Sequence, residues 1–195
     1  MNKKTLLLIT LVTEGGLYFL GLMLMNSAQL ELRSVFNVSW KAILYAILLT
    51  LPMFVTLFLI ERTNIKSIVD LKKEMDEKVL PIFSGTNLFD LAFIAFFAGV
   101  GEELFFRGWM QVVLADRFGL VVGIFITSLV FGFLHYLSSA YAVYAFITSI
   151  YLGIIYHLTG NVFIVMAIHA VYDFVALVYL VRKSKDVSSE TTVSE

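Results

Sequence analysis

Residues 88–112 read LFDLAFIAFFAGVGEELFFRGWMQV, an apolar run that is interrupted near its end by Glu102, Glu103 and Arg107. About 20 predominantly apolar residues cross the roughly 30 Å hydrocarbon core of a bilayer, so this stretch is long enough to span one. Each charge at the centre of a membrane helix costs roughly 2.5–3.5 kcal/mol on insertion scales, so three neighbouring charges require partners. The segment therefore predicts a membrane fold and marks the first candidate for a functional site.

The whole chain has the composition of an integral membrane protein. Of its 195 residues, 59% are hydrophobic and only 15% are charged, whereas soluble domains have roughly 25% charged residues. The net charge of −1 provides no basic field, so nucleic acid is not expected as a partner. The absence of cysteine excludes disulfides, thiolate nucleophiles and cysteine-ligated metals. We expect an all-α polytopic protein that is embedded in the lipid bilayer.

Five further apolar stretches surround residues 88–112 and predict about six transmembrane helices in total. The six predicted spans are residues 5–26, 40–60, 88–112, 118–137, 139–158 and 161–181. Basic residues gather before the first span, between the second and third, and after the sixth, although Arg33 and Lys41 dissent. With six spans the three basic groups share one side, and the positive-inside rule makes that side the cytoplasm. We expect a multi-pass protein of the cell membrane with both termini in the cytoplasm.

The connections divide the chain into three parts. Residues 1–87 hold two scaffold helices and a polar connection at 61–87, which is either an amphipathic helix at the membrane surface or a solvated linker. Residues 88–182 hold four helices joined by short turns, and every polar motif lies among them, so we expect a four-helix catalytic core there. Residues 183–195 are polar and acidic, which predicts a disordered tail.

Helical spacing separates the charges of the first motif. Four residues turn an α-helix by about 400°, so positions i and i+4 lie on nearly the same face. Glu103 and Arg107 are therefore predicted to form a local ion pair, which reduces the net charge held in the membrane. Glu102 is rotated by about 100° from Glu103 and remains free for chemistry.

Two other predicted helices also carry ionisable residues. One ends in Phe131-Gly-Phe-Leu-His135, and the last carries His169-Ala-Val-Tyr-Asp173, whose histidine and aspartate share a face. A lone membrane histidine more often makes a helix–helix hydrogen bond than it catalyses a reaction. Three segments with ionisable groups change that balance, because Glu102 and the two histidines could meet with Asp173 in one pocket. Such a set can deprotonate water and stabilise an oxyanion.

The motifs Glu-Glu-x-x-x-Arg, Phe-x-x-x-His and His-x-x-x-Asp occur in this order on separate predicted helices. In this respect the chain resembles the CAAX protease and bacteriocin-processing family, also called the ABI or Rce1-like type II CAAX prenyl endopeptidase family of intramembrane glutamic proteases. The resemblance covers about residues 88–182. It implies an intramembrane endopeptidase that acts on a membrane-associated peptide or protein with neither a metal nor another cofactor.

The resemblance also implies a role for each matching residue. Glu102 would be the catalytic base that activates a water, which His135 would help to bind or orient. The residues that would support the pocket are Glu103, Arg107 and Phe131. His169 and the residue at position 173 would stabilise the oxyanion, and family members typically have a donating Asn at that position. This chain has Asp173, and because an ionised carboxylate cannot donate, Asp173 is either protonated or orients His169.

Other interpretations of the same residues stay open at this point. Two histidines with one or two carboxylates also make a ligand set for Zn²⁺ with an open water position, although the single-helix His-Glu-x-x-His spacing is absent. A non-catalytic bacteriocin-immunity or membrane accessory protein would bind a partner through the same polar core. A proton-coupled carrier would also place Glu, His and Asp within a membrane. Nothing in the sequence distinguishes a prenylated substrate from an ordinary peptide.

Overall fold

The computed structural model describes residues 2–83 and 85–193, with side chains as far as Lys183. Within these residues the chain is helical with no strand, which confirms the all-α fold. The elements in chain order are α1 (Lys3–Ser27), α2 (Leu32–Val35), α3 (Trp40–Arg62), α4 (Lys66–Glu74), the π-helix η1 (Met75–Val79), the 3₁₀-helix η2 (Leu80–Ile82), α5 (Leu88–Glu103), the π-helix η3 (Leu104–Gln111), α6 (Val112–Phe118), α7 (Leu120–Leu134), α8 (Ser139–Thr159) and α9 (Val162–Val193).

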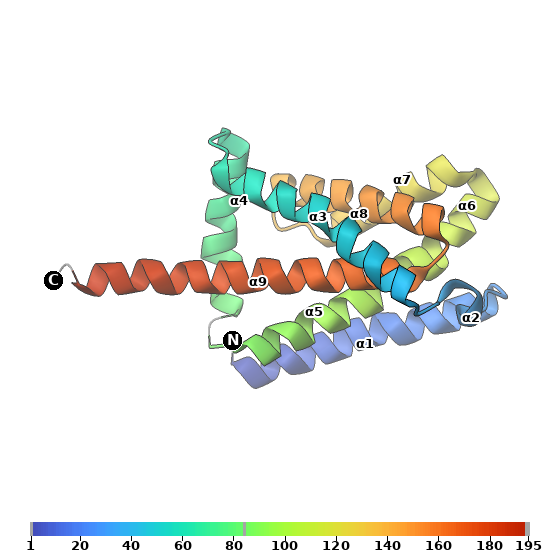
Figure 1. Cartoon of the computed structure of the whole chain (residues 1–195), viewed down its shortest axis with the longest axis horizontal. Coiled ribbons are helices and arrows are strands. Elements are labelled where there is room, and N and C mark those ends of the chain that lie inside the picture. Colours follow the sequence, from blue (N-terminus) through green and yellow to red (C-terminus); the bar gives the residue numbers. More distant parts are fainter. Residues whose placement is uncertain (1, 84, 194–195) are drawn as a thin grey trace.

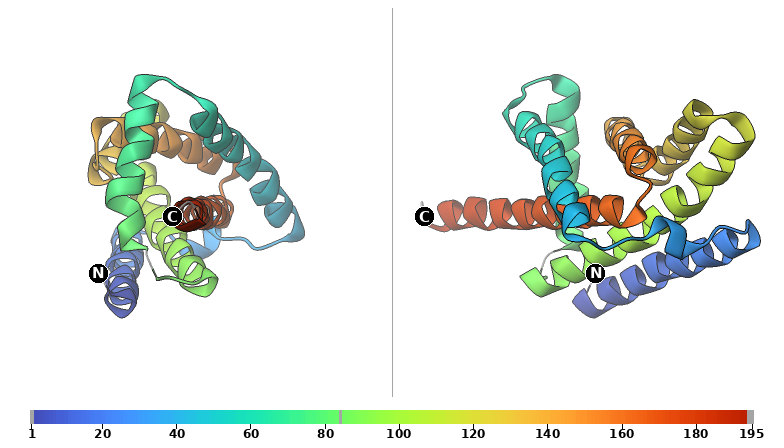
Figure 2. Two further views of the ribbon diagram at one scale, coloured as in Figure 1. Left: turned by 90° about the vertical axis from the view of Figure 1, so that its left-hand side faces the viewer. Right: turned by 45° about the vertical axis from the view of Figure 1, so that its right-hand side comes forward.

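Helix α9 runs through the middle of the molecule, and α3, α5 and α8 pack against it (Figure 1). Seen end-on, α9 lies between α3 on one side and α5 with α1 on the other (Figure 2). Helix α1 packs along α5 and reaches η3, whereas α7 packs against both α6 and α8. The acidic end of α5 is thus placed in the interior, where α5, α7 and α9 meet.

The prediction of about six membrane spans is not confirmed. Four helices in the described part of the chain are long and apolar enough to cross a membrane, namely α1, α3, α8 and α9 up to Lys183. Helix α7 has 15 residues, which extend only about 22 Å at 1.5 Å per residue. The predicted span at 88–112 is divided among α5, η3 and α6, and charged residues lie at the junction of α5 and η3. Length and charge therefore keep these segments from qualifying as ordinary spans.

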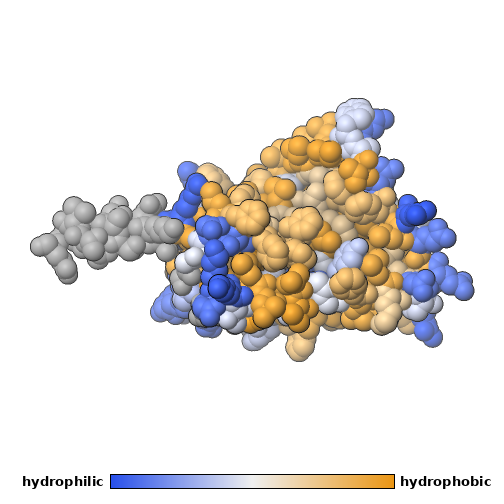
Figure 3. All heavy atoms as spheres, turned by 90° about the horizontal axis from the view of Figure 1, so that it is seen from below, coloured by the Kyte–Doolittle hydropathy of each residue, from blue (hydrophilic) through white to orange (hydrophobic). Residues whose placement is uncertain are grey.

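The surface is nevertheless that of a multi-pass membrane protein. In the face shown in Figure 3, apolar residues cover the middle and polar residues gather towards the two ends. Phe19 on α1 and Trp40 on α3 each expose 70% of their surface. Soluble monomers rarely leave a continuous apolar area of this extent in water. The N-terminus, α4 and the C-terminal end of α9 lie at the same end of the molecule (Figure 1), so the basic residues near them can share one side of the membrane.

The polar connection at 61–87 is largely helical, as one of the two alternatives predicted. Leu71 of α4 is buried, and the Lys72 ammonium donates to the carbonyl oxygens of Glu61 and Thr63 at 3.1 and 3.2 Å. Lys72 therefore satisfies backbone acceptors at the end of α3. At the other terminus, α9 continues as helix to Val193, over most of the segment expected to be a disordered tail. The division into scaffold, core and tail stays a prediction.

Close backbone contacts hold α5 between α1 and α9. A Cβ atom at Gly101 would overlap the carbonyl oxygen of Glu14 on α1, and a Cβ at Gly99 would lie 2.8 Å from the backbone nitrogen of Ala170 on α9. Only glycine allows helices to approach this closely. The last turn of α5 is therefore fixed against both neighbours.

The starts of α1 and α5 are also joined. Asn87 and Asp90 form a capping box, in which the backbone N–H of Asn87 donates to Asp90 Oδ2 at 2.8 Å and that of Asp90 to Asn87 Oδ1 at 3.0 Å. This arrangement satisfies two backbone donors that a helix N-terminus leaves unpaired. The Lys3 ammonium lies 2.8 Å from Asp90 Oδ2, so an ion pair links the two helices at their first turns.

Candidate active site

The site is built on the change from α-helix to π-helix after Glu103. Glu102 and Glu103 are the last residues of α5, and Arg107 lies in η3. Single turns of π-helix are rare and occur often at functional sites. Glu103 and Arg107 have no exposed surface, and Glu102 exposes 8%. Arg107 Nη1 lies 2.7 Å from Glu103 Oε1, which confirms the predicted local ion pair.

Arg107 also links η3 to α8. Its Nη2 donates to the backbone oxygen of Ser149 at 2.9 Å and to the Ser149 hydroxyl at 2.8 Å. One turn further along, Gln111 Nε2 donates to the backbone oxygen of Gly153 at 2.9 Å. These buried hydrogen bonds hold the π-helical segment in place, and the two from the Arg107 guanidinium are charge-assisted. Ser149 and Gln111 were not predicted from the sequence, where their only signal is a polar side chain within an otherwise apolar stretch.

His169 of α9 is held by the same glutamate. Its Nδ1 lies 2.8 Å from Glu103 Oε1, so this carboxylate oxygen serves both Arg107 and His169. A carboxylate paired with a guanidinium accepts hydrogen bonds, which places a hydrogen on Nδ1 of His169. The opposite nitrogen, Nε2, lies 3.3 Å from Asp173 Oδ2 and 3.9 Å from Glu102 Oε2.

His135 follows the last residue of α7 and approaches Glu102 from another side. Its Nδ1 lies 2.9 Å from the backbone oxygen of Phe131, which can only accept, so Nδ1 carries a hydrogen. The imidazole stacks on the Phe131 ring with the two centroids 4.2 Å apart. The Arg107 guanidinium lies 5.1 Å from the centroid of that ring. This arrangement directs Nε2 of His135 towards Glu102 Oε1, at 3.6 Å.

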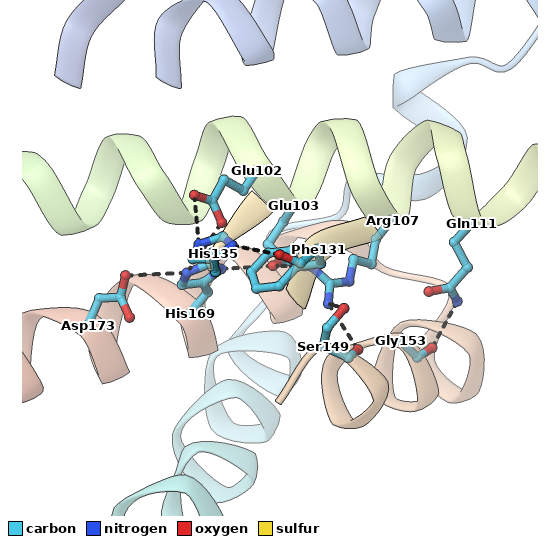
Figure 4. A network of polar contacts seen from close by, with 10 residues as sticks. All are labelled: Glu102, Glu103, Arg107, Gln111, Phe131, His135, Ser149, Gly153, His169 and Asp173. Carbon is cyan, nitrogen blue, oxygen red and sulfur yellow. Dashed lines mark hydrogen bonds and ion pairs between the residues drawn. The ribbon is translucent and has the colours of Figure 1, made fainter. Parts of the chain in front are cut away.

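The structure therefore brings all the residues of the predicted site together. Figure 4 shows Glu102 facing both histidines, with Asp173 beside His169 and Glu103 between His169 and Arg107. The Asp173 side chain exposes 33% of its surface and the Glu102 side chain 11%, so Asp173 lies at the rim of the site. Asp173 Oδ2 lies 3.3 Å from Nε2 of His169, a distance that fits both alternatives for Asp173. The catalytic role of each residue stays a prediction.

A cavity of about 270 Å³ extends from the rim towards the polar end of the molecule. Near the site it is lined by Asp173 and by tyrosines of α8 and α9, of which Tyr144 and Tyr172 are hydrogen-bonded through their hydroxyls. Its other wall includes Lys72 and Lys183. Lys183 follows Asp173 by ten residues on α9, a distance of about 15 Å along the helix axis. The cavity thus connects the polar end of the molecule with Asp173 at the rim of the site.

Metal coordination requires several donors around one point. In the part of the chain that the structure describes, no group of three or more His, Cys, Asp or Glu side chains is arranged to hold a metal ion. That the site works without a metal stays a prediction, which a chelator can test.

A comparison with protein families identifies the same region of the chain. Residues 84–175 match the model of the type II CAAX prenyl endopeptidase Rce1-like family. The matched segment contains the whole constellation from Glu102 to Asp173. No curated protein and no solved structure matched the chain.

Proposed function

Because residues 84–175 form an Rce1-like type II CAAX prenyl endopeptidase domain, we propose that this membrane protein is an intramembrane endopeptidase. It hydrolyses a peptide bond of a membrane-associated peptide or protein. The observation that carries the proposal is the position of Glu102, whose two oxygens face Nε2 of His135 at 3.6 Å and Nε2 of His169 at 3.9 Å. A buried carboxylate beside two imidazole nitrogens on other helices is suited to hold and deprotonate a water.

The attacking water would lie beside Glu102 and His135. Their separation exceeds a hydrogen bond, so a water adjacent to both atoms can bond to each of them. With its hydrogen on Nδ1, a neutral His135 has an acceptor at Nε2. Glu102 removes one water proton while the water oxygen forms a bond to the carbonyl carbon of the substrate. The carbonyl π-bond breaks in this step, and its electron pair remains on the oxygen.

The resulting oxyanion would be stabilised from α9. When His169 carries a hydrogen on both nitrogens, Nε2–H can donate to the oxyanion while Nδ1–H stays bonded to Glu103. Asp173 contacts the same Nε2 and either orients it as a carboxylate or, when protonated, donates itself. The oxyanion electron pair then re-forms the carbonyl π-bond, the carbon–nitrogen bond breaks, and the proton held by Glu102 passes to the amine nitrogen.

The first test is the substitution Glu102→Gln, which keeps the size of the side chain and removes the base. Purified wild type and variant are incubated with a library of membrane-associated peptides, and the cleavage products are identified by mass spectrometry. Loss of general-base catalysis is expected to lower kcat by about 10²–10⁴-fold. Glu77→Gln is the matched control, because the Glu77 side chain is 60% exposed and lies outside the site. Undiminished cleavage by Glu102→Gln would disprove this mechanism.

Chelation separates the proposal from its alternatives. Cleavage that survives a chelator and is lost in Glu102→Gln supports the metal-free protease. Loss of cleavage on chelation and its return with Zn²⁺ would instead favour a metal-dependent protease that uses the same residues. A bacteriocin-immunity or accessory protein would keep its full cellular activity after Glu102→Gln. A proton-coupled carrier would show pH-dependent flux in liposomes.

A further inference from the structure

A carboxyl group of α1 borders the site and has no part in the mechanism above. Glu14 lies near the middle of α1, where a charged side chain is costly in a membrane. The Thr13 hydroxyl lies 3.0 Å from Glu14 Oε1, but Glu14 Oε2 is buried and has no hydrogen-bond partner among the described residues. No salt bridge in the described part of the chain includes Glu14.

Glu14 is held against the catalytic end of α5. Its backbone oxygen occupies the space that a Cβ atom at Gly101 would need, so α1 and α5 touch one residue before Glu102. Glu14 therefore lies beside the turn of α5 that carries Glu102, and Glu102 in turn faces His135 and His169. Between the two helices, a cavity of about 710 Å³ is bordered by Glu14 and Gly101.

Glu102, like Glu14, has a carboxyl oxygen that lacks a hydrogen-bond partner among the described residues. This oxygen, Oε2, is buried, and Nε2 of His169 lies 3.9 Å from it, beyond hydrogen-bond distance. A buried acceptor that stays unpaired costs free energy, and two neighbouring carboxylates repel each other. One proton or one water between Glu14 and Glu102 would satisfy both oxygens and reduce the repulsion.

We propose that Glu14 and Glu102 share a hydrogen bond, through one proton or one water, and that Glu14 is thereby a positioning residue of the reaction. It fixes the Glu102 carboxylate in the orientation that faces both histidines. Glu14 need not contact the substrate for this role. The assignment rests on the proposed function, in which Glu102 is the base.

Two substitutions of Glu14 separate positioning from packing. Glu14→Leu removes the hydrogen-bonding group but suits a membrane helix, so its unfolding temperature is expected to equal or exceed that of wild type. Its kcat is expected to fall about tenfold through misplacement of Glu102, with KM changed less than about twofold. Glu14→Gln keeps an acceptor and a donor at the same place, so it is expected to retain at least about half of the wild-type kcat.

Leu11→Ala is the control, because Leu11 lines the same cavity without a polar group, and it is expected to leave kcat unchanged. Wild-type kcat in Glu14→Leu would overturn the shared hydrogen bond. Equal losses in Glu14→Leu and Glu14→Gln would overturn it as well. So would a lower unfolding temperature in both variants, because Glu14 would then act through packing.

Infrared spectroscopy tests the bridge without any substrate. The carboxyl band of Glu102, assigned by its disappearance in Glu102→Gln, is expected to shift in Glu14→Leu and to change little in Leu11→Ala. A band that stays in place in Glu14→Leu would overturn the bridge. This readout does not depend on cleavage, so a failure of the bridge is distinguishable from a failure of the proposed protease activity.

Discussion

Glu103 joins two elements of the site, because its Oε1 contacts both Arg107 of η3 and His169 of α9. The pair Glu103–Arg107 could be predicted from spacing, because four residues along one helix bring the side chains together whatever surrounds them. The contact of Arg107 with Ser149 spans 42 residues of sequence and depends on how η3 packs against α8, so no local pattern indicates it. Glu14 was missed for the same reason, since only the packing of α1 on α5 brings it to the site.

The two adjacent glutamates should differ sharply in their effect on stability. Glu103→Gln leaves the buried Arg107 charge without its partner, which is expected to lower the free energy of unfolding by about 3–5 kcal/mol. Glu102→Gln leaves the Glu103–Arg107 pair intact and should change the free energy of unfolding by less than about 1 kcal/mol. Chemical unfolding of both purified variants in the same detergent measures the difference. Equal stability of the two variants would mean that the Glu103–Arg107 pair does not hold the site.

At the scale of helices, the long apolar stretches of the sequence predicted where most helices lie but not where one helix ends and the next begins. The predicted span at 88–112 contains a change to π-helix at Leu104, and a hydrophobic run has no feature that indicates such a change. The break between α6 and α7 is a different case. Gly119 adopts a positive φ of 88°, and a Cβ at Gly123 would lie 2.7 Å from the backbone nitrogen of Ala115, so the two helices fold tightly onto each other. The short α7 that results could not be predicted from hydropathy alone.

The contact between α1 and α5 can be tested with two glycines that differ in their surroundings. Gly101→Ala would force a methyl group into the Glu14 carbonyl, and overpacking of this kind is expected to cost about 1–3 kcal/mol of stability. Gly16→Ala is the matched control, because no atom lies within 4 Å of its added Cβ, and Ala is favoured over Gly in a helix by roughly 0.5–1 kcal/mol. Unfolding of both variants in detergent measures the contrast. A Gly101→Ala protein as stable as wild type would contradict the close contact.

For the whole molecule, composition was enough to predict an all-helical membrane protein, because a chain this apolar has to cover its surface with lipid. The arrangement around α9 was not predictable, since apolar helices present few differences that would select their neighbours. That arrangement decides the function proposed for the protein. It places the acidic end of α5 beside α9 and leaves a cavity from Asp173 to the end of the molecule that carries α4.

We predict the orientation of the protein in the membrane from the distribution of basic residues between the two ends of the molecule. Helix α4 and its basic residues lie at the end that also holds the start of α1 and the C-terminal end of α9 (Figure 1), and the positive-inside rule predicts that this end faces the cytoplasm. The chain has no cysteine, so single cysteines introduced at exposed positions report on one site each. In intact cells, a membrane-impermeant maleimide is expected to label Arg33→Cys and not Lys73→Cys, whereas opening the cells should expose Lys73→Cys as well. The reverse pattern would place the cavity mouth outside the cell, and a substrate would then have to reach Asp173 from the extracellular side.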